Sequence, residues 1–420
     1  MSLENIIIEH ARKAKEASFK ALYLSTAEKK EILSQMANAL SDTKENIQKE
    51  NLKDLERAKV NSLSEAMIDR LRLDGSRFNS MVEGVRAIAE LDDPIGQELE
   101  SWSRPNGLEV VKQSVPIGVI GIIYESRPNV TADAAALCIK TSNAVILRGG
   151  SEAIYSNTAI AKALIEGGKK AAMPDGMLEF ISTTDREGVR FLVEQEEYLD
   201  LIIPRGGEGL IRAVSKMSKV PVLKHYKGVC HIYVDKDADL GKAENICINA
   251  KVQRPGVCNA METMLVDEKI ADTFLKSLYP KLKEKGVKLR GDKKTLEILS
   301  CDDIELANED DWHTEYLDLV LAVKVVSSLG EAISHINKYG SGHTDAIISE
   351  NVESQNEFSR GIDTGVLVIN ASTRFNDGSE FGFGAEIGIS TDKLHARGPV
   401  GPRGITTYKY IVRGNGQIRS

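Results

Sequence analysis

Cysteine is scarce in this chain and never forms a CxxC pair. The five cysteines, an odd number among 420 residues, are Cys138, Cys230, Cys247, Cys258 and Cys301. This usage excludes a disulfide framework and a zinc ribbon, which need paired and regularly spaced cysteines. We therefore predict a cytoplasmic protein that works in a reducing compartment.

Long apolar runs and an excess of basic charge are also missing. The longest apolar run, Pro116–Tyr124, is far shorter than the about 18 residues that a membrane helix needs. The short apolar stretch near the N-terminus has glutamates on both sides, which is not the pattern of a signal peptide. The net charge of −8 argues against nucleic acid as a partner, because nucleic-acid binders usually carry a basic excess.

The common cofactor and metal motifs are absent as well. The chain has no GxGxxG fingerprint, no GK[ST] phosphate loop, no HExxH and no GxSxG. Its seven histidines are scattered without metal-ligand spacing. We therefore predict no metal site, and these motifs leave the cofactor open.

What is present is the composition of a large globular protein. Hydrophobic residues make up 42% and charged residues 28% of the chain, and 420 residues are too many for one ordinary core. The apolar spacing up to about Leu91 is helical, and Ser25 followed by Glu28 predicts a capping box. From Leu108 onward strands and helices alternate, which predicts an α/β fold with largely parallel sheets.

The alternation forms two series with a boundary predicted near Gly228. The expected strands are 108–115, 117–124, 144–147, 178–181, 199–203, 228–234, 262–266, 319–326, 346–348 and 366–369. The expected helices are 132–140, 151–172, 186–197, 210–217, 240–251, 270–285 and 329–338. Strand 199–203 is expected to end at Pro204, and 375–404 to be a loop. The last strand, Thr406–Val412, has no obvious partner and is expected to pair with an edge such as one on another subunit.

Cys258 is the most informative residue of the second series. Pro255 and Gly256 predict irregular backbone before it, and Arg254 lies four residues upstream. A free thiol has a pKa of about 8.5, and only the thiolate is a good nucleophile. A guanidinium brought close by the fold would favour the thiolate. The stretch suggests covalent catalysis, with a buried, inert cysteine as the alternative.

Two glycine-rich turns follow strands in the first series. They are Arg148–Ser151 and Pro204–Gly207, and each opens a helix. Such turns expose backbone N–H groups and the positive end of a helix dipole, which suit phosphate, and each also carries an arginine. Ordinary β-α turns are the alternative for each alone, and the two together favour a phosphorylated cofactor.

Four blocks of sequence resemble one family over essentially the whole chain. These are Ile122–Asn129, Leu147–Glu152, Gln253–Thr263 and Lys338–Ala346. They are similar to the gamma-glutamyl phosphate reductases, also called glutamate-5-semialdehyde dehydrogenases, of the aldehyde dehydrogenase superfamily. The resemblance implies a Rossmann-like NADP-binding domain in residues 1–227 and an α/β catalytic domain in 228–403. Residues 404–420, with 100–115, would form a small β oligomerisation element.

The resemblance also implies a reaction. It is the NADPH-dependent reduction of L-glutamyl 5-phosphate to L-glutamate 5-semialdehyde with release of phosphate, the second step of proline biosynthesis from glutamate. Cys258 would attack the acyl phosphate, and the resulting thioester would accept hydride from NADPH. The Asn129 amide and the Cys258 backbone N–H would stabilise the oxyanion.

Cofactor and substrate contacts follow from the same resemblance. Glu315 would hold the nicotinamide ribose, and Gly206 and Gly207 would meet the pyrophosphate. The adenosine ribose would be contacted by Arg148, Ser151 and Glu152, where an arginine suits the 2′-phosphate of NADPH. The candidate substrate contacts are Arg127, His225, Lys227, Arg254, Asn370 and Arg374.

One departure from the wider superfamily falls at His225. Hydrolytic aldehyde dehydrogenases carry a glutamate that activates water, and counting back from 237–240 places His225 at that position. The absence of a carboxylate base there favours acyl transfer to phosphate over hydrolysis, although histidine can itself act as a base.

Three alternatives remain open from the sequence. The first is an aldehyde dehydrogenase that acylates coenzyme A. The second is a cysteine hydrolase or acyltransferase without nicotinamide, and the third a non-catalytic nucleotide-binding scaffold. The expected partners are the small-molecule substrate and further copies of the chain in a homo-oligomer, with functional coupling to glutamate 5-kinase.

Overall fold

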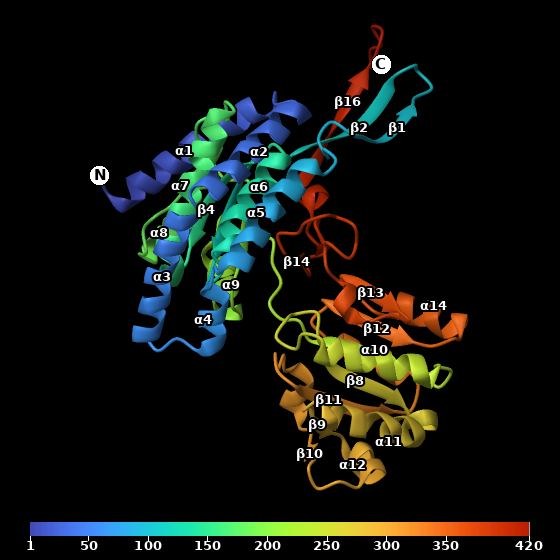
Figure 1. Cartoon of the computed structure of the whole chain (residues 1–420). Coiled ribbons are helices and arrows are strands. Elements are labelled where there is room, and N and C mark those ends of the chain that lie inside the picture. The colour runs from blue at the N-terminus through green and yellow to red at the C-terminus, as the bar shows by residue number, and fades with distance from the viewer. Residues whose placement is uncertain (420) are drawn as a thin grey trace. The chain divides into compact units, whose positions relative to one another are not determined.

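The computed structural model describes residues 1–419, which form two units (Figure 1). Unit 1 contains Met1–Lys224, Gly382–Gly388 and the chain from Val400 onward. Unit 2 contains His225–Phe381 and Ile389–Pro399. The predicted linear division at Gly228 differs from this one, because two segments beyond residue 381 return to unit 1. No helix among the described residues is long and apolar enough to cross a membrane.

Unit 1 is built on a four-stranded parallel sheet. In sheet order its strands are β5 (Leu178–Phe180), β4 (Ala144–Gly149), β3 (Val119–Tyr124) and β6 (Leu201–Arg205). Every residue of β3 and β4 is buried, as expected of strands covered on both faces. The expectation that β6 ends at Pro204 is wrong. Pro204 lies opposite Ile123 in an outer strand of this sheet, where a missing N–H is tolerated.

Helices cover both faces of this sheet. One face packs on α1 (Leu3–Ala21), α8 (Glu187–Val193) and α9 (Glu208–Met217) through a cluster that includes Ile123. The other face packs on α6 (Asn129–Lys140) and α7 (Ile154–Lys170), where the Tyr124 hydroxyl lies 2.6 Å from the Thr131 hydroxyl. The remaining helices pack around these: α2 (Thr26–Asp42), α3 (Lys44–Val60), α4 (Glu65–Leu71) and α5 (Gly75–Glu90). The predicted capping box of Ser25 and Glu28 is confirmed at the start of α2.

The C-terminal strand pairs within the chain, so the expectation of a partner on another subunit is wrong for this edge. β16 (Thr406–Arg413) runs antiparallel to β2 (Glu109–Pro116), which also pairs with β1 (Glu98–Ser103). The pairing of β16 with β2 joins residues about 300 positions apart in sequence. Local sequence patterns carry no signal over such a distance.

Unit 2 is built on a seven-stranded parallel sheet. In sheet order its strands are β10 (Glu305–Leu306), β9 (Lys288–Gly291), β11 (Val320–Val326), β8 (Met261–Asp267), β7 (Cys230–Val234), β12 (Thr344–Ile348) and β13 (Val366–Ile369). One face packs on α10 (Leu240–Val252), α11 (Glu268–Glu284) and α12 (Lys293–Leu299). The other packs on α13 (Leu329–Tyr339) and α14 (Val352–Gly361). Alternate residues of β7 serve the two faces, with Ile232 and Val234 on one and Tyr233 on the other.

The sequence patterns missed several short or polar elements of unit 2. The unpredicted elements are β9, β10, α12 and α14. Helix α14 is polar, and Phe358 is its one buried residue. The expected loop 375–404 also contains the short strands β14 (Ile389–Ser390) and β15 (Gly398–Pro399). Two short 3-10 helices, η3 (Thr373–Phe375) and η4 (Pro402–Ile405), overlap its two ends. Elements of two to four residues are too short to show a hydrophobic period.

A buried histidine lies within an aromatic cluster on α13. The ring centroid of His335 lies 5.3 Å from that of Trp312, 4.5 Å from that of Tyr339 and 5.6 Å from that of His231. Neither ring nitrogen of His335 has a hydrogen-bond partner among the described residues. Burial lowers the pKa of His335 to about 3, because the charged imidazolium would lose its hydration there.

We predict that His335→Phe weakens the acid sensitivity of unit 2. Below pH of about 6.5 the unfolded chain protonates this histidine and the folded chain does not, so stability falls as pH decreases. The linkage amounts to about 2 kcal/mol of unfolding free energy between pH 6.5 and pH 5. Denaturant titrations at these two pH values, followed by Trp312 fluorescence in a Trp102→Phe background, measure the difference. The exposed His313→Phe serves as the control, and an unchanged pH dependence in His335→Phe would contradict the account.

Candidate active site

Three neighbouring parallel strands bring three remote segments together in unit 2. The strands β8, β7 and β12 are adjacent, and their register pairs Cys230 with Met261 and His231 with Asp345. Parallel strands begin at the same edge of a sheet, so the residues that precede them also become neighbours. Cys258 precedes β8, the segment 225–228 precedes β7, and His343 directly precedes β12.

The Cys258 peptide packs against glycine backbone. A Cβ atom at Gly228 would lie 1.9 Å from the Cys258 carbonyl oxygen and 2.7 Å from its Cα, so only glycine fits there. The Gly228 N–H donates to Glu315 Oε1 at 3.0 Å. The Cys230 thiol donates to the Cys258 carbonyl at 3.1 Å. The backbone of the nucleophile candidate is therefore held from the β7 side.

The other side of the loop is clamped to the segment around η3. Asn259 Nδ2 donates to the Asn376 carbonyl at 2.9 Å and to that of Arg374 at 3.4 Å. The Thr373 hydroxyl donates to the Asn259 carbonyl at 2.7 Å. Arg374 Nε donates to Gln253 Oε1 at 2.8 Å. These bonds fix the residue next to Cys258 and the start of its loop.

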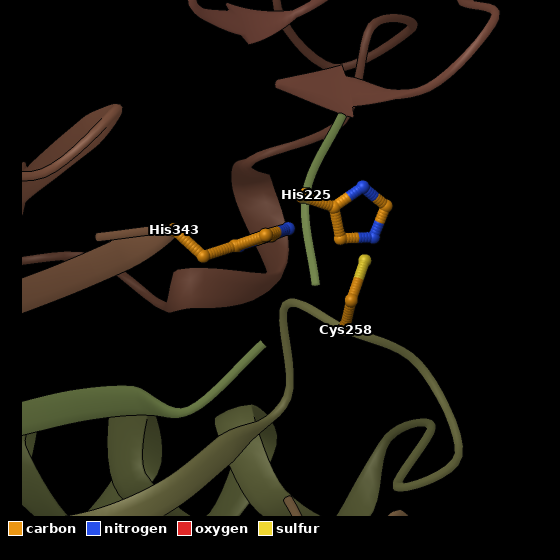
Figure 2. Close-up of side chains that lie close together, drawn as sticks. All are labelled: His225, Cys258 and His343. Atoms are coloured by element: carbon orange, nitrogen blue, oxygen red, sulfur yellow. The ribbon is translucent and has the colours of Figure 1, made fainter. Parts of the chain in front are cut away.

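Two histidines face the Cys258 sulfur (Figure 2). One ligating atom from each of His225, Cys258 and His343 lies within 4.8 Å of the others. His343 is fully buried, whereas His225 and Cys258 are partly exposed. The two imidazole centroids are 5.6 Å apart. His343 was not predicted as a site residue, although its sequence block carried part of the family resemblance.

The predicted substrate arginines of this unit, Arg254 and Arg374, lie close enough for their charges to interact. The pKa of Arg374 is lowered by burial and by the neighbouring charge of Arg254, while Cys258 and Asp377 act in the opposite direction. Two guanidinium groups and a thiol thus share one neighbourhood, which suits an anionic ligand. Lys227 is half-buried next to Gly228.

The side chains of Asn370 and Glu315 form hydrogen bonds with backbone groups. Asn370 adopts a left-handed conformation, with φ of 54°, at the end of β13. Its amide accepts from the Ser349 N–H at 2.9 Å and donates to the Ser349 carbonyl at 3.0 Å. Glu315 accepts the Gly228 N–H. Both side chains therefore brace loops at the sheet edges.

A buried ion pair joins the two ends of the cysteine loop. Lys251 Nζ, in the last turn of α10, lies 2.6 Å from Glu262 Oε2 on β8, and both side chains are fully buried. The Leu317 N–H donates to the other carboxylate oxygen at 3.2 Å. Burial raises the pKa of Glu262 to about 7 and lowers that of Lys251. Removing either partner would leave an uncompensated buried charge under the loop.

The predicted cofactor turns lie in unit 1, at the carboxyl ends of its strands. This is the edge at which open parallel sheets usually bind nucleotides. Gly206 and Gly207 follow β6 and open α9. The Gly207 N–H donates to Glu125 Oε2 at 2.9 Å, and a Cβ at Gly206 would lie 2.3 Å from that oxygen. An anionic group thus already sits at the N-terminus of α9, and this residue was not predicted.

The β4 turn is braced by its own side chains. Arg148 Nη2 donates to the carbonyls of Thr184 and Asp185 at 3.3 and 3.2 Å, and burial lowers the pKa of this guanidinium. Glu152 Oε1 accepts from the N–H of Ser126 at 2.5 Å and from its hydroxyl at 3.0 Å. Ser151 is exposed at the start of the short helix η1 (Ser151–Ala153).

Asn129 and Arg127 lie where β3 turns into α6. Asn129 Nδ2 donates to Asp133 Oδ2 at 2.9 Å, and burial raises the pKa of Asp133 to about 6. An amide nitrogen carries two hydrogens, so this bond orients Asn129 and leaves it able to donate again. Arg127 is exposed in the preceding turn. These residues belong to unit 1 and Cys258 to unit 2.

The known proteins that this chain resembles belong to one family. The model of the aldehyde dehydrogenase family matches residues 4–296 and 309–386. A gamma-glutamyl phosphate reductase from Clostridium botulinum is 53% identical over 98% of this chain and 99% of its own length. A crystal structure of gamma-glutamyl phosphate reductase from Thermotoga maritima is 47% identical, with a TM-score of 0.96 over 99% of this chain and all of its own. The NADP complex of a glyceraldehyde-3-phosphate dehydrogenase from Methanocaldococcus jannaschii shares the fold, at 20% identity and a TM-score of 0.67 over 98% of this chain and 95% of its own.

We predict that Gly228→Ala displaces the cysteine loop. The added methyl group overlaps the Cys258 peptide, so the unfolding free energy falls by about 1–3 kcal/mol and Cys258 alkylation changes several-fold. Denaturant titration and iodoacetamide labelling with peptide mapping measure the two effects. Gly256→Ala in the same loop is the matched control, since its Cβ would meet only the Leu317 carbonyl at 3.7 Å. Equal behaviour of the two variants would contradict the close packing described above.

Proposed function

This chain belongs to the aldehyde dehydrogenase family and, within it, to the gamma-glutamyl phosphate reductases, and from this premise we propose how its residues divide the reaction. It is an oxidoreductase of proline biosynthesis that converts glutamyl 5-phosphate to glutamate 5-semialdehyde. The alternative of a coenzyme A-acylating enzyme is not favoured, because relatives of that type match at far lower identity, 17% for an acetylating aldehyde dehydrogenase.

Cys258 is the proposed nucleophile. This assignment is supported by a partly exposed thiol on a loop held on both sides, with a ring nitrogen of His225 and of His343 within 4.8 Å of its sulfur. The thiol attacks the acyl phosphate carbonyl, phosphate leaves, and a thioester forms on sulfur. His225 is suited to take the thiol proton, because it lies close and is partly exposed.

Asn129 and the Cys258 N–H are the proposed oxyanion donors. The negative charge that develops on the carbonyl oxygen needs donors that are already oriented. The Asp133 carboxylate supports this role for Asn129, since it fixes the amide while a second N–H can still donate.

Arg254 and Arg374 are the proposed partners of the substrate's phosphate and carboxylate. The charge of Arg374 interacts with those of Arg254 and Cys258, which supports this assignment. Lys227, next to Gly228 in unit 2, is a further candidate, and Arg127 of unit 1 is one by the family resemblance. Asn370 is proposed as an indirect contributor that holds the end of β13, because both ends of its amide bind Ser349.

NADPH is the proposed cofactor. When bound, it would supply the hydride that reduces the thioester. The α9 N-terminus supports a pyrophosphate site at Gly206 and Gly207, since a carboxylate already accepts the Gly207 N–H there. Arg148, Ser151 and Glu152 are proposed to face the adenosine ribose, and Glu315 the nicotinamide ribose. The arginine at position 148 supports the preference for the phosphorylated form, because a guanidinium suits a phosphate group.

A homo-oligomer and a kinase that supplies the acyl phosphate are the proposed partners. All six residues of β1 are exposed, and Trp102, Tyr408 and Tyr410 expose 41–54% of their surface on the β1-β2-β16 sheet. Such an aromatic patch is typical of an interface. A monomer in dilute solution with full activity would contradict this assignment.

Glutamate 5-kinase is the proposed supplier of the acyl phosphate. The proposed compartment is the reducing cytoplasm, which the five free cysteines favour.

The reverse reaction tests the proposed chemistry. The purified protein, mixed with glutamate 5-semialdehyde, NADP+ and phosphate, should produce reduced nicotinamide, and Cys258→Ala should abolish the signal. Cys301→Ser is the matched control, because Cys301 is also partly exposed but lies outside the site. Continued turnover without phosphate, beyond one equivalent of reduced nicotinamide per chain, would point to hydrolysis and overturn the interpretation of His225. A stronger signal with NAD+ would overturn the cofactor assignment.

We further predict that Glu125→Gln tightens NADPH binding. The Glu125 carboxylate competes for the Gly207 N–H and repels the cofactor phosphates, so loss of its charge should lower the dissociation constant by about three- to tenfold. Fluorescence titration with NADPH measures this change. Glu187→Gln in the first turn of α8 is the control, as another exposed acid at a helix start. Weaker binding in Glu125→Gln would show that the carboxylate assists the cofactor.

A further inference from the structure

We propose that Cys258, His225 and His343 form a binding site for a thiophilic divalent cation, with Zn²⁺ as the best-suited ion, which reversibly masks the nucleophile. Within residues 1–419 these three side chains form the one group of histidine, cysteine or acidic residues whose ligating atoms converge in this way. One sulfur and two imidazole nitrogens are the donors that Zn²⁺ prefers. Binding of the ion goes beyond the reductase chemistry, whereas masking of the nucleophile rests on the proposed function.

The geometry is close to that of a zinc site. Zn–S bonds of about 2.3 Å and Zn–N bonds of about 2.0–2.1 Å put tetrahedral ligand atoms about 3.3–3.6 Å apart. The three donors lie within 4.8 Å of one another, so a shift of about one ångström closes the site. His225 and Cys258 can make that shift, because both are partly exposed and precede their strands in irregular segments. In Figure 2 a ring nitrogen of His225 faces the sulfur, and the His343 ring points into the same space.

Hydrogen bonds behind the ligands support the site. His343 Nδ1 lies 2.7 Å from the Thr344 hydroxyl, which also accepts from Asn376 Nδ2 at 2.6 Å. The Asn376 carbonyl in turn accepts from Asn259, the neighbour of Cys258. A histidine whose second nitrogen is held in this way is the usual arrangement in metal sites, because the contact fixes the ring orientation.

Histidine spacing along the chain does not indicate this site. The prediction of no metal rested on the spacing of histidines along the chain, and residues 225, 258 and 343 are far apart in it. Parallel pairing of β8, β7 and β12 supplies the proximity that spacing cannot show. With Zn²⁺ bound, the sulfur lone pair forms the metal bond and the thiol proton passes to solvent, so the sulfur can no longer attack a carbonyl.

Metal titration of the whole, chelator-treated protein tests the proposal. We expect one Zn²⁺ per chain with a micromolar or lower dissociation constant, and release of about one proton, seen by calorimetry in two buffers of different ionisation enthalpy. Co²⁺ should give a thiolate-to-cobalt charge-transfer band and the intense visible bands of a tetrahedral site. Zn²⁺ should slow alkylation of Cys258, and a chelator should restore it.

The variants separate this site from adventitious binding. Cys258→Ser should weaken Zn²⁺ binding about 100-fold and remove the charge-transfer band, and His225→Ala should weaken it at least about tenfold. His343→Ala tests the buried ligand, and the partly exposed His225 keeps the test valid if that variant does not fold. Cys301→Ser and His313→Ala are matched controls and should bind like the parent.

Equal binding by Cys258→Ser and the parent protein would overturn the proposal, as would a cobalt spectrum without the thiolate band. These readouts need no turnover. They therefore fail or succeed independently of the reductase assay, which is run with chelator present.

Discussion

The pairing of three parallel strands is the constraint on which the candidate active site of unit 2 depends. β8, β7 and β12 begin at one edge, and their register places Cys258, the segment 225–228 and His343 side by side. Ligand sites in open α/β sheets usually lie at the carboxyl ends of the strands, so the amino-end position in unit 2 is unusual. At this edge the Cys258 peptide comes so close to Gly228 that a side chain at position 228 would overlap it.

Unit 1 follows the usual rule, with the two turns proposed for the cofactor at the carboxyl ends of β4 and β6. The electrostatics of the two units differ accordingly. In unit 1 backbone N–H groups at the start of α9 favour an anion, and the Glu125 carboxylate occupies that position. In unit 2 the charge of Arg374 interacts with those of Arg254 and Cys258, and the buried Lys251–Glu262 pair joins the two ends of the cysteine loop. A net negative chain can thus offer local positive charge to an anionic substrate.

Much of this fold was predictable, because the long β-α alternation and the capping box of Ser25 are local signals. The shortest strands, the polar helix α14 and the β2–β16 pairing were not, since they carry little periodicity or depend on contacts far apart in sequence. Within the site, Cys258 could be singled out from its neighbours. His343 and Glu125 could not, because their roles come from tertiary contacts, and Asn370 turned out to hold backbone that sequence spacing does not reveal.

The most direct test of the account is the mass of the covalent intermediate. The protein would be incubated with glutamate 5-semialdehyde and NADP+ in phosphate-free buffer, quenched in acid and digested for peptide mass spectrometry. We predict a glutamyl adduct on the peptide that contains Cys258, which disappears when phosphate is added before the quench. An adduct on another residue, or turnover with no adduct on Cys258, would contradict the claim that the edge shared by β8, β7 and β12 presents the nucleophile.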